Sequence, residues 1–324
     1  MLTRRKAVAG LGGLAMLPLS SAASAQQGRT VRLVVPAAPG GAIDAIGRLY
    51  ADRLKDILGQ TWVIENRAGA NNTLGAAEVA RSAPDGATLL TNADIHLMAK
   101  HVMKQVPYDP VADFTPISRF ATSPMVFVGH PGKTPADLKA LAAEMKATPD
   151  KHTFSNSGLG AMGHLASESF NTRVGVKTVI VSYRGTAPAL TDVIGGQTTL
   201  MVAPLGSALQ QIQAGSLRAF AIMSERRSSQ LSEVPTAAEA GFPGLNFQLW
   251  YALWGPKGMA ADLVDQINAG VQAASKHPEL VQKLAALGAD PVTETAAQFA
   301  AFFTAEATRS AELARVAGIQ PQAN

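Results

Sequence analysis

The chain has 324 residues, of which 47% are hydrophobic and 16% charged, and these proportions are typical of a soluble globular protein. Its length predicts about two domains. It contains no cysteine, which excludes disulfides, thiol catalysis and cysteine-based zinc sites.

The first 25 residues are predicted to be an export signal. A basic segment at 4–6 precedes a small, apolar segment at 7–19 that is too short to span a membrane, and residues 23–25, Ala-Ser-Ala, fit a cleavage site. We therefore expect an exported protein with a signal peptide over residues 1–25. The Arg-Arg pair leaves general secretion and twin-arginine export both open.

The overall charge does not indicate a nucleic-acid partner. The formal charge is +4, and three basic residues within 1–25 account for three of these charges, so the remainder carries about +1. No Lys/Arg run or basic-aromatic stripe follows, so no nucleic-acid partner is expected. No later stretch is apolar for long enough to span a membrane.

The first predicted unit is a strand at 32–35, a small-residue loop at 36–41 and a helix with apolar residues at helical spacing. Gly40 and Gly41 let a ligand approach bare backbone N–H groups at the helix start, which is a site for an anion. Asp44 lies in the first turn, where it suits the helix dipole and is expected to cap or orient the loop. The alternative is a plain strand-to-helix turn that needs glycine for its dihedrals.

Strands and helices alternate along the rest of the chain, which predicts an α/β fold with mostly parallel sheets. A proline-rich segment at 107–116 breaks the first series, and an aromatic segment returns near Trp250. These breaks predict a first lobe of residues 28–122 and 252–324 and a second lobe of residues 123–251. The further predicted strands are 62–65, 88–91, 125–128, 153–155, 178–181, 199–202 and 219–223, and the C-terminal helices are 260–275, 278–287 and 295 onward.

The strand–glycine loop–helix pattern occurs a second time, at residues 153–170. Gly158, Gly160 and Gly163 match the G-x-G-x-x-G dinucleotide fingerprint between a strand and a helix. The next strand ends at Ser182-Tyr183-Arg184, where an arginine suits the 2′-phosphate of NADP better than an acidic residue would. An exported NADP-dependent oxidoreductase is therefore kept as the alternative to a binding protein.

Other catalytic patterns are weak. His164 and Glu168 lie four residues apart on one predicted helix face, which is half a metal site, and no third ligand is spaced to join them. No G-x-S-x-G nucleophile motif is present. We expect neither a bound metal nor a catalytic residue.

Several segments in a fixed order resemble the Bug-type extracytoplasmic solute receptors, the substrate-binding proteins of tripartite tricarboxylate transporters. The resemblance implies a two-lobe periplasmic binding protein of the Venus-flytrap type, each lobe a mostly parallel sheet flanked by helices, with no cofactor. It also implies a monomer that binds a small carboxylate between its lobes and delivers it to membrane permease subunits. The segments are VVPAAPGGAIDAIGR (34–48), ENRAGANNTLGAAEVARSAPDGATLL (65–90), YDPVADFTPI (108–117), SNSGLGAMGHLASESF (155–170), YRGTAPALTDVIGGQ (183–197) and PTAAEAGFPG (235–244).

The resemblance and the two loops together predict the ligand-binding residues. Backbone amides of Gly41, Ala42 and Ile43 and of Gly158–Ala161 are expected to converge on one cleft. Asn92, Asp94 and His96 are placed in a loop that often lines the cleft in this family. The predicted binding residues are Ala37, Ala38, Gly40, Gly41, Ala42, Asp44, His96, Ser155, Ser157, Gly158, Gly160, Ala161, His164, Tyr183, Arg184 and Ala203.

Departures from the family pattern predict the type of ligand. Ala161 and Ala203 stand where the family often has polar residues, so a second charge on the ligand would lose its hydration without a partner. The aromatic residues Phe247, Trp250, Tyr251 and Trp254 lie at the second crossing between the lobes, where hinge packing is the alternative role; any one that faces the cleft would offer a flat apolar wall. The ligand expected is a monocarboxylate with an apolar or aromatic body, in preference to citrate, aspartate or glutamate.

Overall fold

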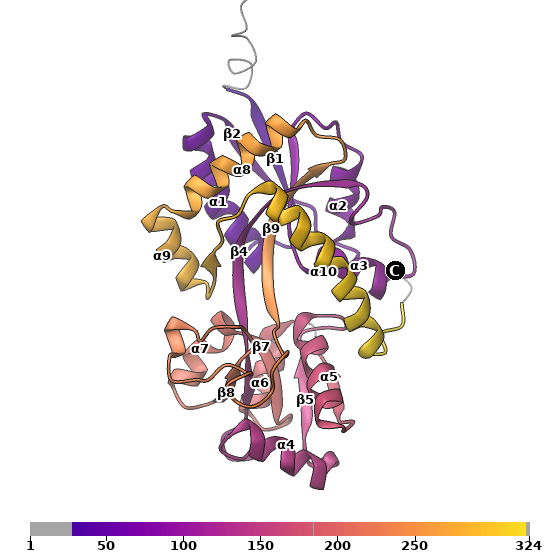
Figure 1. Cartoon of the computed structure of the whole chain (residues 1–324), viewed down its shortest axis with the longest axis vertical. Coiled ribbons are helices and arrows are strands. Elements are labelled where there is room, and N and C mark those ends of the chain that lie inside the picture. The colour runs from indigo at the N-terminus through magenta and orange to yellow at the C-terminus, as the bar shows by residue number, and fades with distance from the viewer. Residues whose placement is uncertain (1–27, 184, 322–324) are drawn as a thin grey trace, which may run out of the picture.

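The computed structural model describes residues 28–183 and 185–321. The signal peptide predicted for residues 1–25 and the predicted binding residue Arg184 lie outside the described residues. The described chain forms two lobes stacked along the long axis of the molecule (Figure 1).

The first lobe is built on a mixed sheet. Its parallel part has the order β2-β1-β3, and β9 joins β3 in the antiparallel direction. β4 and the short β10 extend the sheet with further antiparallel pairs. The strands are β1 (Thr30–Val35), β2 (Thr61–Asn66), β3 (Thr88–Ala93), β4 (Phe114–Gly129), β9 (Gln248–Pro256) and β10 (Asp290–Pro291).

The second lobe repeats this plan on the far half of β4. Three parallel strands have the order β6-β5-β7, and β4 pairs antiparallel with both β7 and β8. The predicted α/β fold with two lobes is confirmed, with antiparallel strands added to each parallel set. The strands are β5 (Thr153–Asn156), β6 (Val179–Ser182), β7 (Leu200–Pro204) and β8 (Arg218–Ile222).

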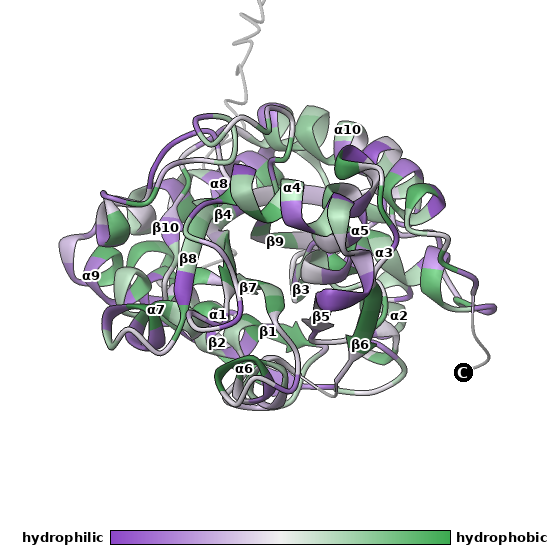
Figure 2. Ribbon diagram, turned by 90° about the horizontal axis from the view of Figure 1, so that it is seen from below, coloured by the Kyte–Doolittle hydropathy of each residue, from purple (hydrophilic) through white to green (hydrophobic). Residues whose placement is uncertain are grey.

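Helices cover both faces of each sheet, and central strands such as β3 and β9 are therefore buried on both faces. Four buried clusters result, two in each lobe. In Figure 2 the helices around the sheets alternate between hydrophilic and hydrophobic residues along their ribbons. The helices of the first lobe are α1 (Ala42–Leu58), α2 (Thr73–Ala80), α3 (Ile95–Val102), α8 (Ala261–Ser275), α9 (Pro278–Ala286) and α10 (Ala296–Val316), and those of the second are α4 (Leu138–Ala147), α5 (Met162–Val174), α6 (Thr186–Ile194) and α7 (Leu205–Gln213).

Two long strands connect the lobes. β4 and β9 pair from one end of β9 to the other, from Phe114–Pro256 to Pro124–Gln248. The proline-rich segment 107–116 leads directly into β4. The predicted boundaries after residues 122 and 251 fall inside these two strands, and the division of the chain at those residues stays a prediction.

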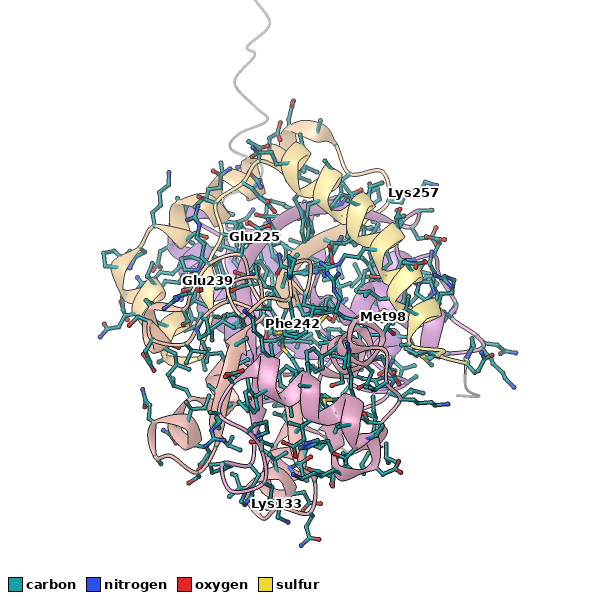
Figure 3. The ribbon with its side chains drawn as sticks, turned by 60° about the horizontal axis from the view of Figure 1, so that its bottom comes forward. Met98, Lys133, Glu225, Glu239, Phe242 and Lys257 are labelled. Carbon is teal, nitrogen blue, oxygen red and sulfur yellow. The ribbon has the colours of Figure 1, made fainter. Side chains whose placement is uncertain are left out.

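The lobes also touch along one side, through α3 and α10. Met98 and Ala314 belong to the buried cluster that contains Met125 and Phe127 of the second lobe. The first half of α10 instead packs on the first lobe, where Phe299 contacts Trp254. In Figure 3 Met98 lies near the middle of the molecule, whereas Lys133 and Lys257 lie at its periphery.

Candidate functional site

A cavity of about 560 Å³ lies between the lobes, at the carboxyl ends of strands from both sheets. This is where open α/β sheets bind ligands, and the volume suits a small molecule with ordered water. The lining comes from four regions: the β1–α1 loop with Asn72, the β3–α3 junction, the two crossing strands with the end of α9, and the helix starts of the second lobe. The lining residues are Ala37, Gly40, Gly41, Ala42, Ile43, Ala45, Asn72, Ala93, Asp94, Ile95, Ser123, Met125, Ser157, Ala161, Met162, Gly163, Thr186, Pro204, Gly206, Ser207, Leu249, Tyr251, Ala286 and Leu287.

The loop before α1 is held in place by Asp44. Gly40 has a φ of 82°, which favours glycine, and its N–H donates to Asp44 Oδ2 at 2.9 Å. Asp44 also accepts from Arg48 Nε at 3.0 Å and from Asn66 Nδ2 at 2.9 Å. Asn66 Nδ2 donates in addition to the Ala37 carbonyl at 3.0 Å, so one polar cluster holds both ends of the loop.

The charge of Asp44 is stabilised in the folded state. Burial by itself would raise the pKa of Asp44, but hydrogen bonds from Arg48, the Gly40 N–H and Asn66 outweigh it and lower the pKa to about 2. Asp44 therefore orients the loop as an ion. It does not line the cavity.

This geometry predicts a pH-dependent effect of Asp44→Asn. A folded-state pKa of about 2, below the ordinary 3.8, means that Asp44 stabilises the fold above about pH 4 and that this contribution is lost as the pH falls toward 2. We expect the variant to lose about 2 kcal/mol of unfolding free energy at neutral pH and to approach the wild type in acid. Urea unfolding of the variant between about pH 2 and pH 7 measures this loss. Asp265→Asn, at an exposed position, is the control. An equal loss at every pH would contradict the assignment.

Among the helix N-termini at the cavity, four begin at a Gly, Ala or Pro, whose side chain cannot cap the helix. The N-cap residues of α1, α5, α6 and α7 are Gly41, Ala161, Gly185 and Pro204, and none accepts a side-chain cap hydrogen bond. Of the helices that begin away from the cavity, α4 and α10 are capped by Asp137 and Thr295, whereas α8 and α9 also lack a side-chain cap. The first-turn N–H groups at the cavity are thus left for a ligand, and the helix dipoles favour an anion there.

The second glycine loop contributes in part as predicted. Ser157 and Ala161 line the cavity, followed by Met162 and Gly163 at the start of α5. The predicted convergence of the Gly158–Ala161 amides on the cleft is not what the structure shows, because the loop uses these groups internally. The Gly158 N–H donates to Asn156 Oδ1, the Gly160 N–H to His164 Nδ1, and the Ala161 N–H to the Gly158 carbonyl.

His96 lies behind the cavity wall. It is fully buried in α3, where its ring contacts Phe114 and Trp254, and its Nε2 is 3.0 Å from the Pro110 carbonyl. Burial lowers the pKa of His96 to about 4, so the side chain is neutral near pH 7. Residues 92–96 lie at the end of β3 and the start of α3, where a loop was expected.

Two predicted residues on strands point into the core. Ser155 Oγ donates to the Ala189 carbonyl, and Ala203 is fully buried in the cluster under α6 and α7. The part of the ligand prediction that rests on Ala203 therefore has no support in the cavity. Nine of the predicted residues lie outside the lining: Ala38, Asp44, His96, Ser155, Gly158, Gly160, His164, Tyr183 and Ala203.

His164 and Glu168, which were considered as half of a metal site, and Tyr183 at the end of β6 contact other residues of the second lobe. His164 Nε2 lies 4.0 Å from Glu168 Oε1, and burial lowers the pKa of His164. No cluster of three metal-ligating His, Cys, Asp or Glu side chains occurs within residues 28–183 and 185–321. The Tyr183 hydroxyl donates to Asp192.

Some lining residues were missed from the sequence. Thr186, Gly206 and Ser207 begin α6 and α7, and Ser123 and Leu249 lie on the crossing strands. Of the four aromatic residues proposed as a wall, Tyr251 lines the cavity. Phe247, Trp250 and Trp254 are buried in the core.

None of the helices in the described part of the chain is long and apolar enough to span a membrane.

Comparison with known proteins agrees with this geometry. Protein BugT of Bordetella pertussis is 35% identical over 292 residues, which are 90% of this chain and 90% of that protein. The solved periplasmic binding protein BugD shares 33% identity with a TM-score of 0.75, over 91% of this chain and 99% of that one. Rpa4515 of R. palustris, solved with adipate, shares 32% identity with a TM-score of 0.78 over 91% and 99% of the two chains. MatC of Rhodopseudomonas palustris, solved with bound malate, shares 31% identity with a TM-score of 0.74 over 88% and 99%.

The family model described as "Tripartite tricarboxylate transporter family receptor" matches residues 46–319, which is most of the chain. The resemblance seen in the sequence is thereby confirmed, and the oxidoreductase alternative is not supported. This chain belongs to the receptor family of the tripartite tricarboxylate transporters, whose members are periplasmic proteins that bind carboxylates.

Proposed function

We propose that this chain binds a small carboxylate in the cavity between its lobes and delivers it to the membrane permease of a tripartite transporter. The observation that carries the proposal is the set of four uncapped helix N-termini at one cavity. No Lys, Arg or His occurs among the described lining residues, so backbone N–H groups supply the positive potential there. Similar proteins solved with adipate and with malate support this ligand class.

Several further points belong to the same proposal. The protein acts in the periplasm as a monomer, after removal of residues 1–25 by secretory or twin-arginine export. It performs no catalysis and uses no cofactor. Closure of the lobes around the ligand would be what the permease recognises, since a ligand that contacts both lobes favours the closed state.

A thermal-shift screen tests the function. A ligand present at a hundred times its Kd adds about 2.7 kcal/mol to the unfolding free energy, so a carboxylate of this class is expected to raise Tm clearly. The panel contains mono- and dicarboxylates, aromatic acids and amino acids, with NADPH as the comparison. Stabilisation by NADPH and by none of the carboxylates would contradict the proposal.

A further inference from the structure

Asp94 is the acidic residue of the cavity. It is the N-cap of α3 and lines the cavity, yet only 8% of its surface is exposed. Its backbone N–H donates to the Trp250 carbonyl, which fixes the residue at the end of β3. No other acidic side chain occurs among the described lining residues.

The Asp94 carboxyl group has no partner from another residue. Within the described part of the chain, no side chain or backbone group of another residue donates to it, and no cation pairs with it. The nearby ionisable groups do not stabilise its charge. Glu306 on α10 raises the pKa of Asp94, and Asp94 in turn raises the pKa of Tyr251, which pairs with Ala93 across β3 and β9. A buried carboxylate without a partner is costly in free energy. A ligand that brings a cationic partner into the cavity would therefore stabilise the charged form of Asp94.

The pKa of Asp94 agrees with the lack of a partner for its carboxyl group. Burial, with a smaller contribution from Glu306, raises the pKa of Asp94 to about 7, and its own backbone N–H opposes the shift. A cation placed beside it would favour the charged form, whereas a second carboxylate would be repelled once Asp94 is ionised.

The cavity is therefore bipolar. The uncapped starts of α1 and α5 favour a carboxylate, and Asp94 at the start of α3 favours a cation. The apolar part of the lining includes Ile95, Met125 and Leu249. We propose that Asp94 is a specificity residue that selects a zwitterionic monocarboxylate; this inference rests on the proposed function. The ligand would pair a cationic nitrogen with Asp94 and carry an apolar body between its two charges.

This inference narrows the proposed function. The expected ligand has one carboxylate and one cationic group, whereas adipate and malate each have two carboxylates. It keeps the expectation of a monocarboxylate with an apolar body and adds one cationic group to it.

Calorimetric titration with matched acids tests the inference. Three series keep one carboxylate and vary the far end: 5-aminopentanoate, hexanoate and adipate; 4-aminobutyrate, pentanoate and glutarate; 4-(aminomethyl)benzoate, 4-ethylbenzoate and 4-carboxyphenylacetate. In at least one series the wild type is expected to bind the amine at least about tenfold more tightly than the other two. Its advantage over the dicarboxylate should grow from about pH 5.5 to about pH 8, as Asp94 ionises.

Asp94→Asn is the decisive variant, because it keeps the shape of the side chain and removes the charge. We expect it to lose about tenfold in amine affinity, to gain in dicarboxylate affinity and to lose the pH dependence. Asp265→Asn, an exposed change of the same kind on α8, should behave as the wild type.

The two proposals fail in different ways. If the wild type binds a dicarboxylate at least as tightly as the amine in every series, or if Asp94→Asn leaves the preference unchanged, the inference about Asp94 is overturned and carboxylate binding stands. If no carboxylate of any class binds the wild type, the proposed function is overturned as well.

Discussion

Gly41→Val is expected to weaken carboxylate binding by roughly a hundredfold while leaving the fold intact. A Cβ at Gly41 would meet only the Ala38 carbonyl, at 3.5 Å, which is an ordinary contact. Its φ of −73° is also open to any residue. The added side chain would occupy the approach to the first-turn N–H groups of α1. The loss of two hydrogen bonds to a charged ligand costs about 3 kcal/mol of binding free energy, which corresponds to a rise in Kd of roughly a hundredfold.

The measurement is calorimetric titration with the tightest carboxylate from the screen, together with urea unfolding of the unliganded protein. Gly41→Ala should give an intermediate loss, because a single methyl covers less of the helix start. Gly132→Val in the exposed loop after β4 serves as the matched control. Normal affinity in Gly41→Val would show that the ligand does not bind at the start of α1.

The first half of the site was predictable because it is local in the sequence. The loop before α1 combines a strand, two glycines and a helix within a few residues, and Gly40, Gly41 and Ala42 line the cavity as expected. The second loop was placed correctly, but its internal hydrogen bonds were not foreseen. Whether Gly158 and Gly160 offer their N–H groups depends on partners such as His164 and Asn156, and sequence spacing does not determine these.

Two physical reasons explain why the sequence analysis missed some of the lining residues. Thr186, Gly206 and Ser207 follow β6 and β7, and the rule that ligands bind beyond the carboxyl ends of strands would have indicated them. Ser123 and Leu249 are different, because they line the cavity only through the pairing of β4 with β9, which lie far apart in the sequence. Ser155 and Ala203 were wrongly placed in the cleft because the direction in which a residue of a short buried strand points depends on its register, which the sequence alone leaves open.

The G-x-G-x-x-G match also has a structural explanation. Gly158 and Gly160 have φ values of 153° and 76°, and Gly163 permits close contact between α5 and β7. A dinucleotide loop needs glycines for the same reasons: a tight turn, then close packing of helix on strand. The motif therefore reports a strand–loop–helix geometry that a carboxylate receptor shares with dinucleotide-binding enzymes.

Gly163→Ala is accordingly expected to destabilise the protein by about 3 kcal/mol, the upper range for an overpacked core. A Cβ at Gly163 would lie 2.3 Å from the Val202 carbonyl oxygen, so α5 or β7 must move. Because Gly163 also lines the cavity, the shift should weaken carboxylate binding. Gly41→Ala is the matched control, since the same methyl there meets no atom closer than 3.5 Å and should change the unfolding free energy little. Urea unfolding of the two variants compares them directly, and equal stability would show that α5 is not held against β7 through Gly163.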